Sequence, residues 1–307
     1  MAQEFAGTLG RKAVALYLAL WAVCTGYLAL KGADWTFPII SLVLFGTILS
    51  ALGWWLTRHT TAPTVAVSNP RRQLLWFMAY LLLYAFGLIG WGLGAVKAAV
   101  TDPAMREWAE LGYKLIIHVA IPASLIAWLG GSLADTFDSG LKRRGVRLAL
   151  AVFAALMFAL LAVVSPSLKE LSDTGTHGLA AFGWIVAAWL WVSLEAGLCE
   201  EYLFRAGLQS RLTAWIGSPL AAILGTSVLF ALVHWPGLYL RGGPGVDGWS
   251  TDPVQVAAFT IAVLSPLSVM VGVLWARTRS LVLVVLVHGA VDALPHASEM
   301  VRAFGAG

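Results

Sequence analysis

Long apolar runs, broken by short polar connections, dominate the hydrophobic pattern of this chain. Runs long enough to cross the roughly 30 Å of hydrocarbon in a bilayer are typical of transmembrane helices. They lie near residues 13–30, 37–57, 74–96, 113–133, 146–164, 179–204, 218–238, 254–276 and 281–297. The sixth run is expected to continue as a helix beyond the bilayer core, toward Arg211. The pattern predicts an all-α, polytopic integral membrane bundle of about eight to nine transmembrane helices.

The composition excludes a soluble protein, since 59% of the residues are hydrophobic and only 12% are charged. A soluble domain carries about a quarter charged residues. The basic residues sit in short loops, where they orient helices, so lipids rather than nucleic acid are the expected partner. Cys24 and Cys199 lie in apolar stretches and are expected to be small buried side chains.

The distribution of Lys and Arg predicts the orientation. If the N-terminus is cytoplasmic and all nine runs span, 13 of the 20 Lys and Arg residues lie on the inner side and 7 on the outer side. Positive charge favours the cytoplasmic side, so the N-terminus is expected there. The first run, after Arg11 and Lys12, exceeds a signal-peptide core and is expected to stay as an uncleaved span. High Ala, Gly, Trp and Leu usage favours a bacterial inner membrane.

Ionisable residues within the apolar runs are the candidates for chemistry. Glu200 and Glu201 are adjacent in the sixth run, and His234 and His288 stand alone in the seventh and ninth. A carboxylate at bilayer depth is costly unless it faces a bundle interior or a wet cavity. Counting 1.5 Å per residue from the inner connections allows the three helices to bring these side chains together. The sequence therefore predicts a polar site within the membrane.

Helical spacing separates the roles of these residues. Glu201 and Arg205 are four apart, so they can form an ion pair. Glu200 is rotated by about 100° from Glu201 and must face other neighbours. Asp292 is one turn beyond His288 and is expected to orient its ring.

Two further buried groups have plainer interpretations. Glu195 is an additional acid five residues before Glu200, and it either lines the cavity or serves structure. His118 is the mid-span ionisable residue of the first half, and it is expected to be a core histidine bonded to a neighbouring helix.

One carboxylate and two imidazoles are compatible with two mechanisms. In the first, Glu200 is the general base for a water that His234 also holds, and His288 stabilises the oxyanion. In the second, Glu200, His234 and His288 bind zinc and leave a position open for water. The first is favoured, because the chain lacks a His-Glu-x-x-His helix, the strongest zinc-protease signature.

Three motifs in order carry a family resemblance. They are Glu200-Glu201-Tyr-Leu-Phe-Arg205, Phe230-Ala-Leu-Val-His234 and His288-Gly-Ala-Val-Asp292. In order and spacing they resemble the CAAX-protease and bacteriocin-processing family of intramembrane proteases, which includes the Rce1-type prenyl endopeptidases and the bacterial "abortive infection" proteins. The resemblance covers roughly residues 180–295.

The resemblance implies a peptidase of glutamic or metal-dependent type, with zinc as the metal in the second case. Its substrates would be membrane-anchored or lipidated, CAAX-like peptides. It implies that Glu200 and His234 activate water and that His288 and Asp292 serve the oxyanion side, with Glu201 among the catalytic residues.

Arg205, Phe230 and Glu195 are the expected supporting or substrate-side residues. Asp292 departs from the commoner Asn of the family, and an ionised Asp cannot donate a hydrogen bond. Glu195-Ala-Gly also departs, since relatives often have Ala-Pro before the glutamate pair.

Two segments are expected along the chain. Residues 1–175 form N-terminal transmembrane helices to which the motifs assign no role, and residues 176–307 form the catalytic core. A proton-coupled transporter and a non-catalytic membrane scaffold remain alternative functions. The chain shows no repeated halves, a feature common among carriers, and its intramembrane ionisable residues crowd into the last third.

Overall fold

Residues 2–63 and 67–305 are described by the structure, a computed structural model, and every regular element among them is helical. Within that part, nine helices are long and apolar enough to cross a membrane. They are Ala6–Leu30, Thr36–Leu56, Pro70–Ala99, Pro103–Trp128, Arg144–Val164, Gly178–Ile216, Pro219–Arg241, Pro253–Thr278 and Leu281–Phe304. The all-α, polytopic membrane fold predicted from the sequence is confirmed.

Several spans are built from consecutive α-helical and π-helical stretches. The first, fifth and last three spans are single helices, namely α1 (Ala2–Leu30), α8 (Arg144–Val164), α13 (Pro219–Arg241), α14 (Pro253–Thr278) and α15 (Leu281–Phe304). The second joins α2 (Thr36–Ser41), η1 (Leu42–Leu49) and α3 (Ser50–Leu56); the third joins α4 (Pro70–Leu82), η2 (Leu83–Gly92) and α5 (Leu93–Ala99); the fourth joins α6 (Pro103–Leu115), η3 (Ile116–Ala120) and α7 (Ile121–Trp128). The sixth joins α10 (Gly178–Val192), η5 (Ser193–Leu198), α11 (Cys199–Glu201), η6 (Tyr202–Gln209) and α12 (Ser210–Ile216). Two short helices, η4 (Ala134–Thr136) and α9 (Ser167–Asp173), lie in connections.

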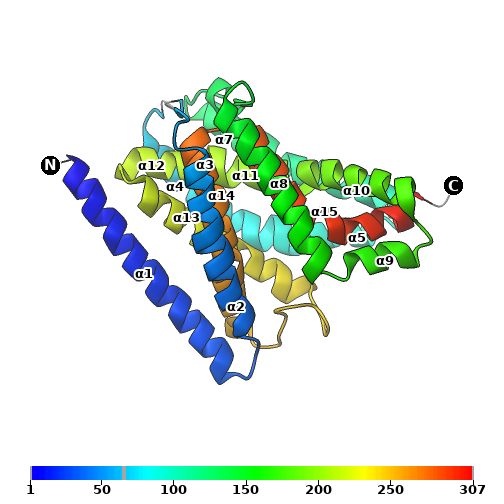
Figure 1. The fold of residues 1–307 in the computed structure, drawn as a ribbon. Helices are drawn as coiled ribbons and strands as arrows, with labels where there is room; N and C mark the ends of the chain where they lie inside the picture. The colour runs from blue at the N-terminus through cyan, green and yellow to red at the C-terminus, as the bar shows by residue number, and fades with distance from the viewer. Residues whose placement is uncertain (1, 64–66, 306–307) are drawn as a thin grey trace.

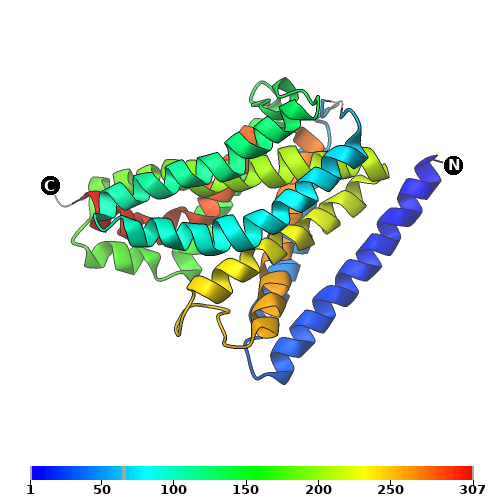
Figure 2. The ribbon, with the colours of Figure 1, turned by 180° about the vertical axis from the view of Figure 1, so that it is seen from behind.

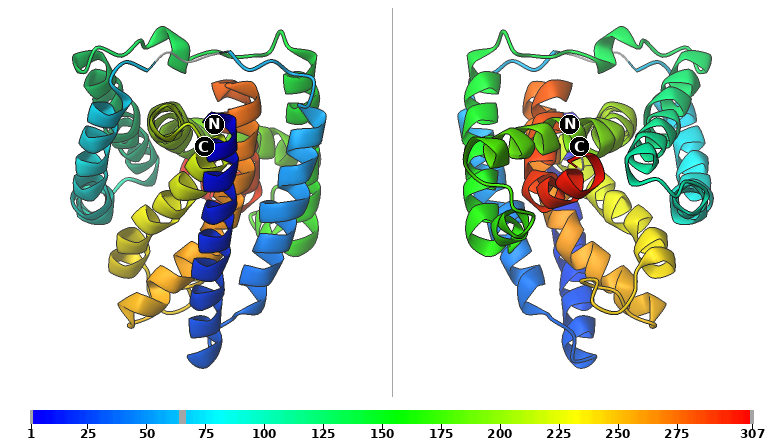
Figure 3. Two further views of the ribbon diagram at one scale, coloured as in Figure 1. Left: turned by 90° about the vertical axis from the view of Figure 1, so that its left-hand side faces the viewer. Right: turned by 90° about the vertical axis from the view of Figure 1, so that its right-hand side faces the viewer.

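The spans are arranged as a centre with two flanks. In Figure 3, α13 and α14 lie between the third and fourth spans on one side and α2, α3 and α8 on the other. The loop that follows α7 crosses one end of the bundle, while α1 lies along an outer edge (Figures 1 and 3). Figure 2 shows the third and fourth spans side by side on the face turned away in Figure 1. The centre is thus enclosed by helices from the first half of the chain.

The three central helices begin at side-chain caps that the sequence supplies. The hydroxyl of Ser218 accepts from Ala221 N at the start of α13, and that of Ser280 accepts from Leu283 N at the start of α15. Asp252 does the same for α14, accepting from Val254 N at 2.9 Å. Such caps satisfy backbone N–H groups that a helix start leaves unpaired.

The boundaries of two spans differ from the expectation for one physical reason. The fourth begins at Pro103 rather than near 113, and the ninth runs to Phe304 rather than 297. The added turns carry charged side chains, including Glu107, Glu110 and Glu299, which line a cavity inside the bundle. Charges that face an internal cavity shorten the apolar run without ending the helix.

Candidate active site

The sixth span passes very close to α15 at the glutamate pair. Two glycines permit this approach. A Cβ on Gly197 would lie 2.5 Å from the Val285 carbonyl oxygen, and one on Gly289 would lie 2.8 Å from the Cα of Ser193. The glutamates occupy α11, between the π-helical stretches η5 and η6. Departures of this kind from α-helical geometry recur at functional sites. This contact sets the acids against the face of α15 that carries His288.

Glu201 is fully buried and bonds to two partners, Arg205 and His288. Its Oε2 accepts from Arg205 Nε at 2.7 Å, the ion pair expected from their spacing, and its Oε1 accepts from His288 Nδ1 at 2.7 Å. Arg205 also donates to Ser268 Oγ on α14, at 2.9 Å, and lies over the Phe230 ring. Glu201 therefore fixes both the arginine and the ring of His288.

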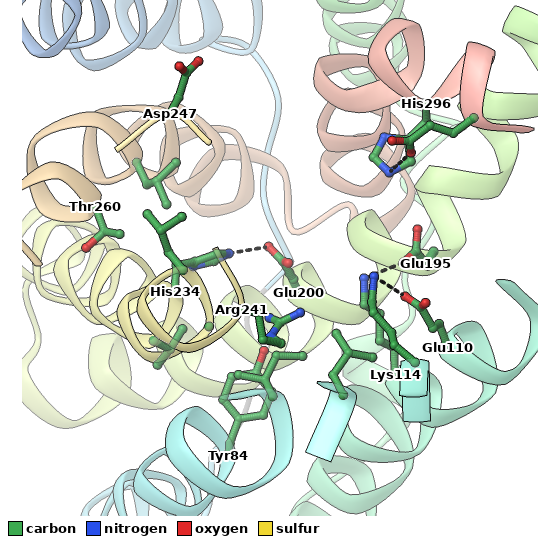
Figure 4. A pocket seen from close by; sticks show the side chains of 18 of the residues that line it. Tyr84, Glu110, Lys114, Glu195, Glu200, His234, Arg241, Asp247, Thr260 and His296 are labelled. Carbon is green, nitrogen blue, oxygen red and sulfur yellow. Dashed lines mark hydrogen bonds and ion pairs between the residues drawn. The ribbon is translucent and has the colours of Figure 1, made fainter. Parts of the chain in front are cut away.

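Glu200 also approaches His288, so the expectation that it must face other neighbours than Glu201 is wrong, because one imidazole ring presents its two nitrogens to the two carboxylates. Its Oε2 lies 3.6 Å from His234 Nε2 and 3.7 Å from His288 Nε2. His234 comes from α13, and its Nδ1 donates to the Phe230 carbonyl at 2.7 Å. The pair formed by Glu200 and His234 is seen in Figure 4. One carboxylate oxygen is thus approached by the Nε2 atoms of two imidazoles from two other helices.

The position of Asp292 differs from the expectation that it orients the ring of His288. Its Oδ2 lies 3.5 Å from His288 Nε2, and the hydrogen bond to this ring comes from Glu201 through Nδ1. Spacing along one helix identified Asp292 as a neighbour, but it could not identify a closer carboxylate from another span. Asp292 therefore stands on the side of His288 that faces Glu200.

A cavity of about 450 Å³ opens beside these residues, and Glu200 and His234 line it. Lys114 of the fourth span and Glu195 form a 2.5 Å ion pair on its wall (Figure 4). Tyr84 of the third span also lines it. Glu195 is thus a cavity-lining acid. Lys114 and Tyr84 were not identified from the sequence, because each lies in an ordinary amphipathic or apolar stretch and acquires its partner from another span.

Cys24 and Cys199 are free and buried, as expected of small apolar side chains. Zinc needs its ligand atoms about 2.0–2.3 Å from one common point. Within residues 2–63 and 67–305, no three His, Cys, Asp or Glu side chains are arranged to hold a metal ion. However, Glu200 Oε2 lies 3.6 and 3.7 Å from the Nε2 atoms of His234 and His288, close to the separation of donors that share one zinc ion. Zinc binding by these three residues therefore stays a prediction, and no chemical step is derived through a metal.

Comparisons with known proteins agree with the motifs. Residues 182–294 match a family model described as type II CAAX prenyl endopeptidase Rce1-like. Neither the comparison with curated proteins nor that with solved structures gave a match. The matched segment contains Glu200, Glu201, His234, His288 and Asp292. The resemblance expected from the three motifs is thereby confirmed, and the C-terminal spans of this chain carry the pattern of the Rce1-like family.

Proposed function

We propose that the protein is an intramembrane endopeptidase that hydrolyses peptide bonds of membrane-anchored or lipidated substrates through a water activated by Glu200 and His234. The observation that carries this proposal is the approach of two imidazole Nε2 atoms to one Glu200 oxygen, beside a cavity and within the bundle. A carboxylate and an imidazole separated by 3.6 Å can share one water. The family match supports a peptidase acting at the membrane.

The hydrogen bonds define how the water is held. Because His234 Nδ1 donates its hydrogen to the Phe230 carbonyl, the neutral ring presents an acceptor at Nε2. The water donates one hydrogen to Glu200 and the other to His234, which leaves its oxygen lone pair free. As that oxygen bonds to the substrate carbonyl carbon, Glu200 takes the proton, and it later returns the proton to the departing nitrogen.

We assign stabilisation of the oxyanion to His288. Its Nδ1 hydrogen is committed to Glu201, so only Nε2 faces the reacting groups. In the imidazolium form, that nitrogen donates to the oxyanion as negative charge develops. Asp292, 3.5 Å from Nε2, supports the charged ring by attraction. Glu201 and Arg205 do not reach the reacting atoms in this scheme, and they hold His288 in place.

The family match supports the proposed substrate, and the cavity and the charges support the proposed side of entry. CAAX-like, lipidated peptides are proposed as substrates from the family match. We place the protein in a bacterial inner membrane with its N-terminus in the cytoplasm, since 13 of the 20 Lys and Arg residues then lie inside. The cavity wall includes exposed Arg241 and Asp247, so it opens on the opposite side. Asp247→Cys should therefore react with a membrane-impermeant thiol reagent in intact cells, and a lack of labelling would reverse the orientation.

Purified protein in detergent, offered a quenched fluorescent peptide with a farnesylated Cys-aliphatic-aliphatic-X end, tests the activity. Glu200→Gln removes the base and should lower kcat by at least about 10³-fold. Glu170→Gln, on exposed α9, is the matched control and should leave kcat unchanged. Intact cleavage by Glu200→Gln would refute the mechanism. Loss of proton-coupled uptake in vesicles without any peptidase activity would instead identify a carrier, and neither effect would identify a scaffold.

Treatment with a chelator distinguishes the glutamic mechanism from the metal-dependent one. The proposed activation of water by Glu200 and His234 uses no metal, so we expect full activity after dialysis against EDTA, with no stoichiometric zinc in an elemental analysis of the active protein. Loss of cleavage that zinc restores would establish the metal-dependent alternative.

A further inference from the structure

Tyr84, which lines the cavity, forms a buried pair with His118, and both residues lie outside the segment that matches the family. The Tyr84 hydroxyl lies 2.6 Å from His118 Nε2, and the two rings meet edge to face. Tyr84 comes from η2 of the third span, and His118 comes from η3 of the fourth. Neither residue is used in the mechanism above.

The second nitrogen of His118 determines the direction of the hydrogen bond. His118 Nδ1 lies 2.9 Å from the Lys114 carbonyl, which can only accept, so Nδ1 carries the hydrogen. In the neutral ring, Nε2 is then an acceptor, and the Tyr84 hydroxyl must donate to it. The hydroxyl hydrogen is thereby held toward His118, and the oxygen can offer only lone pairs to the cavity.

Tyr84 lines the same cavity as Glu200 and His234. Figure 4 shows its hydroxyl directed toward the space beside Glu200 and Arg241. Its helix packs against α13 through one apolar cluster that also contains Phe230, one turn before His234. The position of the hydroxyl is therefore fixed relative to the proposed catalytic groups.

In the proposed reaction, one hydrogen-bond donor remains to pair with the Tyr84 oxygen. Both hydrogens of the water are taken by Glu200 and His234, and the oxyanion needs donors, which Tyr84 cannot supply. The scissile peptide bond also brings an N–H group, and its hydrogen needs an acceptor once the substrate leaves water. We propose that the Tyr84 oxygen accepts this N–H and that His118 holds Tyr84 in its acceptor state.

This inference rests on the proposed peptidase function and adds a substrate-positioning contact from the first half of the chain. Holding the N–H toward Tyr84 fixes the plane of the peptide. As the nitrogen becomes tetrahedral, its new lone pair is then directed away from Tyr84, where the proton on Glu200 can reach it. The contact is specific to amide bonds, because an ester has no N–H at this position.

The test uses two farnesylated probes that differ only in the scissile bond, one an amide and the other an ester with oxygen in place of N–H. Tyr84→Phe deletes one oxygen and should lower kcat for the amide by about 10- to 100-fold. KM for the amide should rise as well, because the contact is already made in the bound ground state, whereas kcat and KM for the ester should stay within about twofold of the wild-type values. Retained ester hydrolysis also shows that the variant is folded.

Tyr80→Phe is the matched control. Tyr80 lies one turn earlier on the same helix, and its hydroxyl donates to the Ile117 carbonyl, beside His118, without lining the cavity. Its loss should affect the two probes equally. His118→Gln offers a side-chain oxygen to the Tyr84 hydroxyl and should retain most amide cleavage, whereas His118→Leu should reproduce the amide-selective loss of Tyr84→Phe.

The outcomes separate this inference from the proposed function. Equal losses on both probes for Tyr84→Phe, or no loss on the amide, would overturn the contact while leaving the peptidase intact. An amide-selective loss in Tyr80→Phe would do the same, because it would assign the effect to packing of the third span. Cleavage of neither probe by the wild-type chain would remove the proposed function itself, and this contact with it.

Discussion

The last three spans and the first six occupy different environments. In their most apolar stretches, 56, 72 and 67% of the residues of α13, α14 and α15 are buried, against 22–39% for the other six spans. The outer spans expose large apolar side chains such as Leu16, Leu83 and Val163, which suits contact with lipid. The central spans instead bury polar groups, including Thr226, Ser265 and Ser268.

The candidate site residues are not confined to the more buried spans. The sixth span is mostly peripheral, yet every residue from Glu201 to Arg211 is buried, and it supplies both glutamates. The site therefore lies at the seam where one outer span crosses the central helices. An outer span therefore contributes residues to the candidate site where it contacts the central helices.

The largest loss of stability is expected for Arg205→Met. Arg205 is fully buried, so its removal leaves the charge of Glu201 without its arginine partner. Breaking such a pair costs about 3–5 kcal/mol, and thermal unfolding in detergent should register it as a large fall in Tm. Arg72→Met, at an exposed position of an outer span, is the control. Similar Tm values for the two variants would erase the distinction between centre and periphery.

An intermediate effect is expected where the sixth span meets α15. Gly289→Ala places a methyl group against the Ser193 backbone, which should cost about 1–3 kcal/mol by forced separation of the helices. The 2.7 Å contact between Glu201 and His288 lengthens with it, so cleavage of the farnesylated probe should fall as well. Gly183→Ala, on the sixth span and with open space around the site of the new Cβ, should retain both stability and activity. A neutral Gly289→Ala would show that close approach does not build the site.

The sequence predicted the fold and the motif residues, but it did not predict the contacts made where the sixth span crosses the central helices. Apolar runs of sufficient length identify a span by themselves, which is why the nine spans were predictable. His234 and His288 stood out because a lone ionisable group in such a run is rare. Tyr84 and Lys114 did not stand out, since their importance arises from hydrogen bonds and ion pairs to other spans. No periodicity along one helix encodes a partner on another, and the roles given to the site residues stay predictions.

A smaller, pH-dependent loss of stability is expected where Asp252 links α1, an outer span, to α14, a central span. Asp252 caps α14 and also accepts from Tyr27 and pairs with Lys31, at 2.8 and 3.0 Å. The hydrogen bonds from Lys31 and Tyr27 lower the pKa of Asp252 from 3.8 to about 2. Because the folded-state pKa is depressed, the stabilisation is full above the unfolded pKa and is lost as the pH falls toward the folded value.

Asp252→Asn keeps a capping side chain but removes the charge. Wild-type Tm should therefore exceed that of the variant at about pH 6, and the difference should shrink by about pH 3. Asp247→Asn, in the adjoining exposed loop, should follow the wild type throughout. A Tm difference for Asp252→Asn that does not change with pH would show that its charge does not tie α1 to the centre.

The smallest effect is expected for a pair that matches Glu201 and Arg205 in spacing and distance. Lys169 and Asp173 on peripheral α9 are also four residues apart, with a 2.6 Å contact, but their side chains are 77 and 59% exposed. Water solvates both charges in the folded and the unfolded chain, and side-chain entropy opposes their pairing. Asp173→Asn should therefore leave Tm unchanged within error at physiological salt. A fall approaching that of Arg205→Met would mean that four-residue spacing, rather than burial at the seam, determines what an ion pair contributes to this bundle.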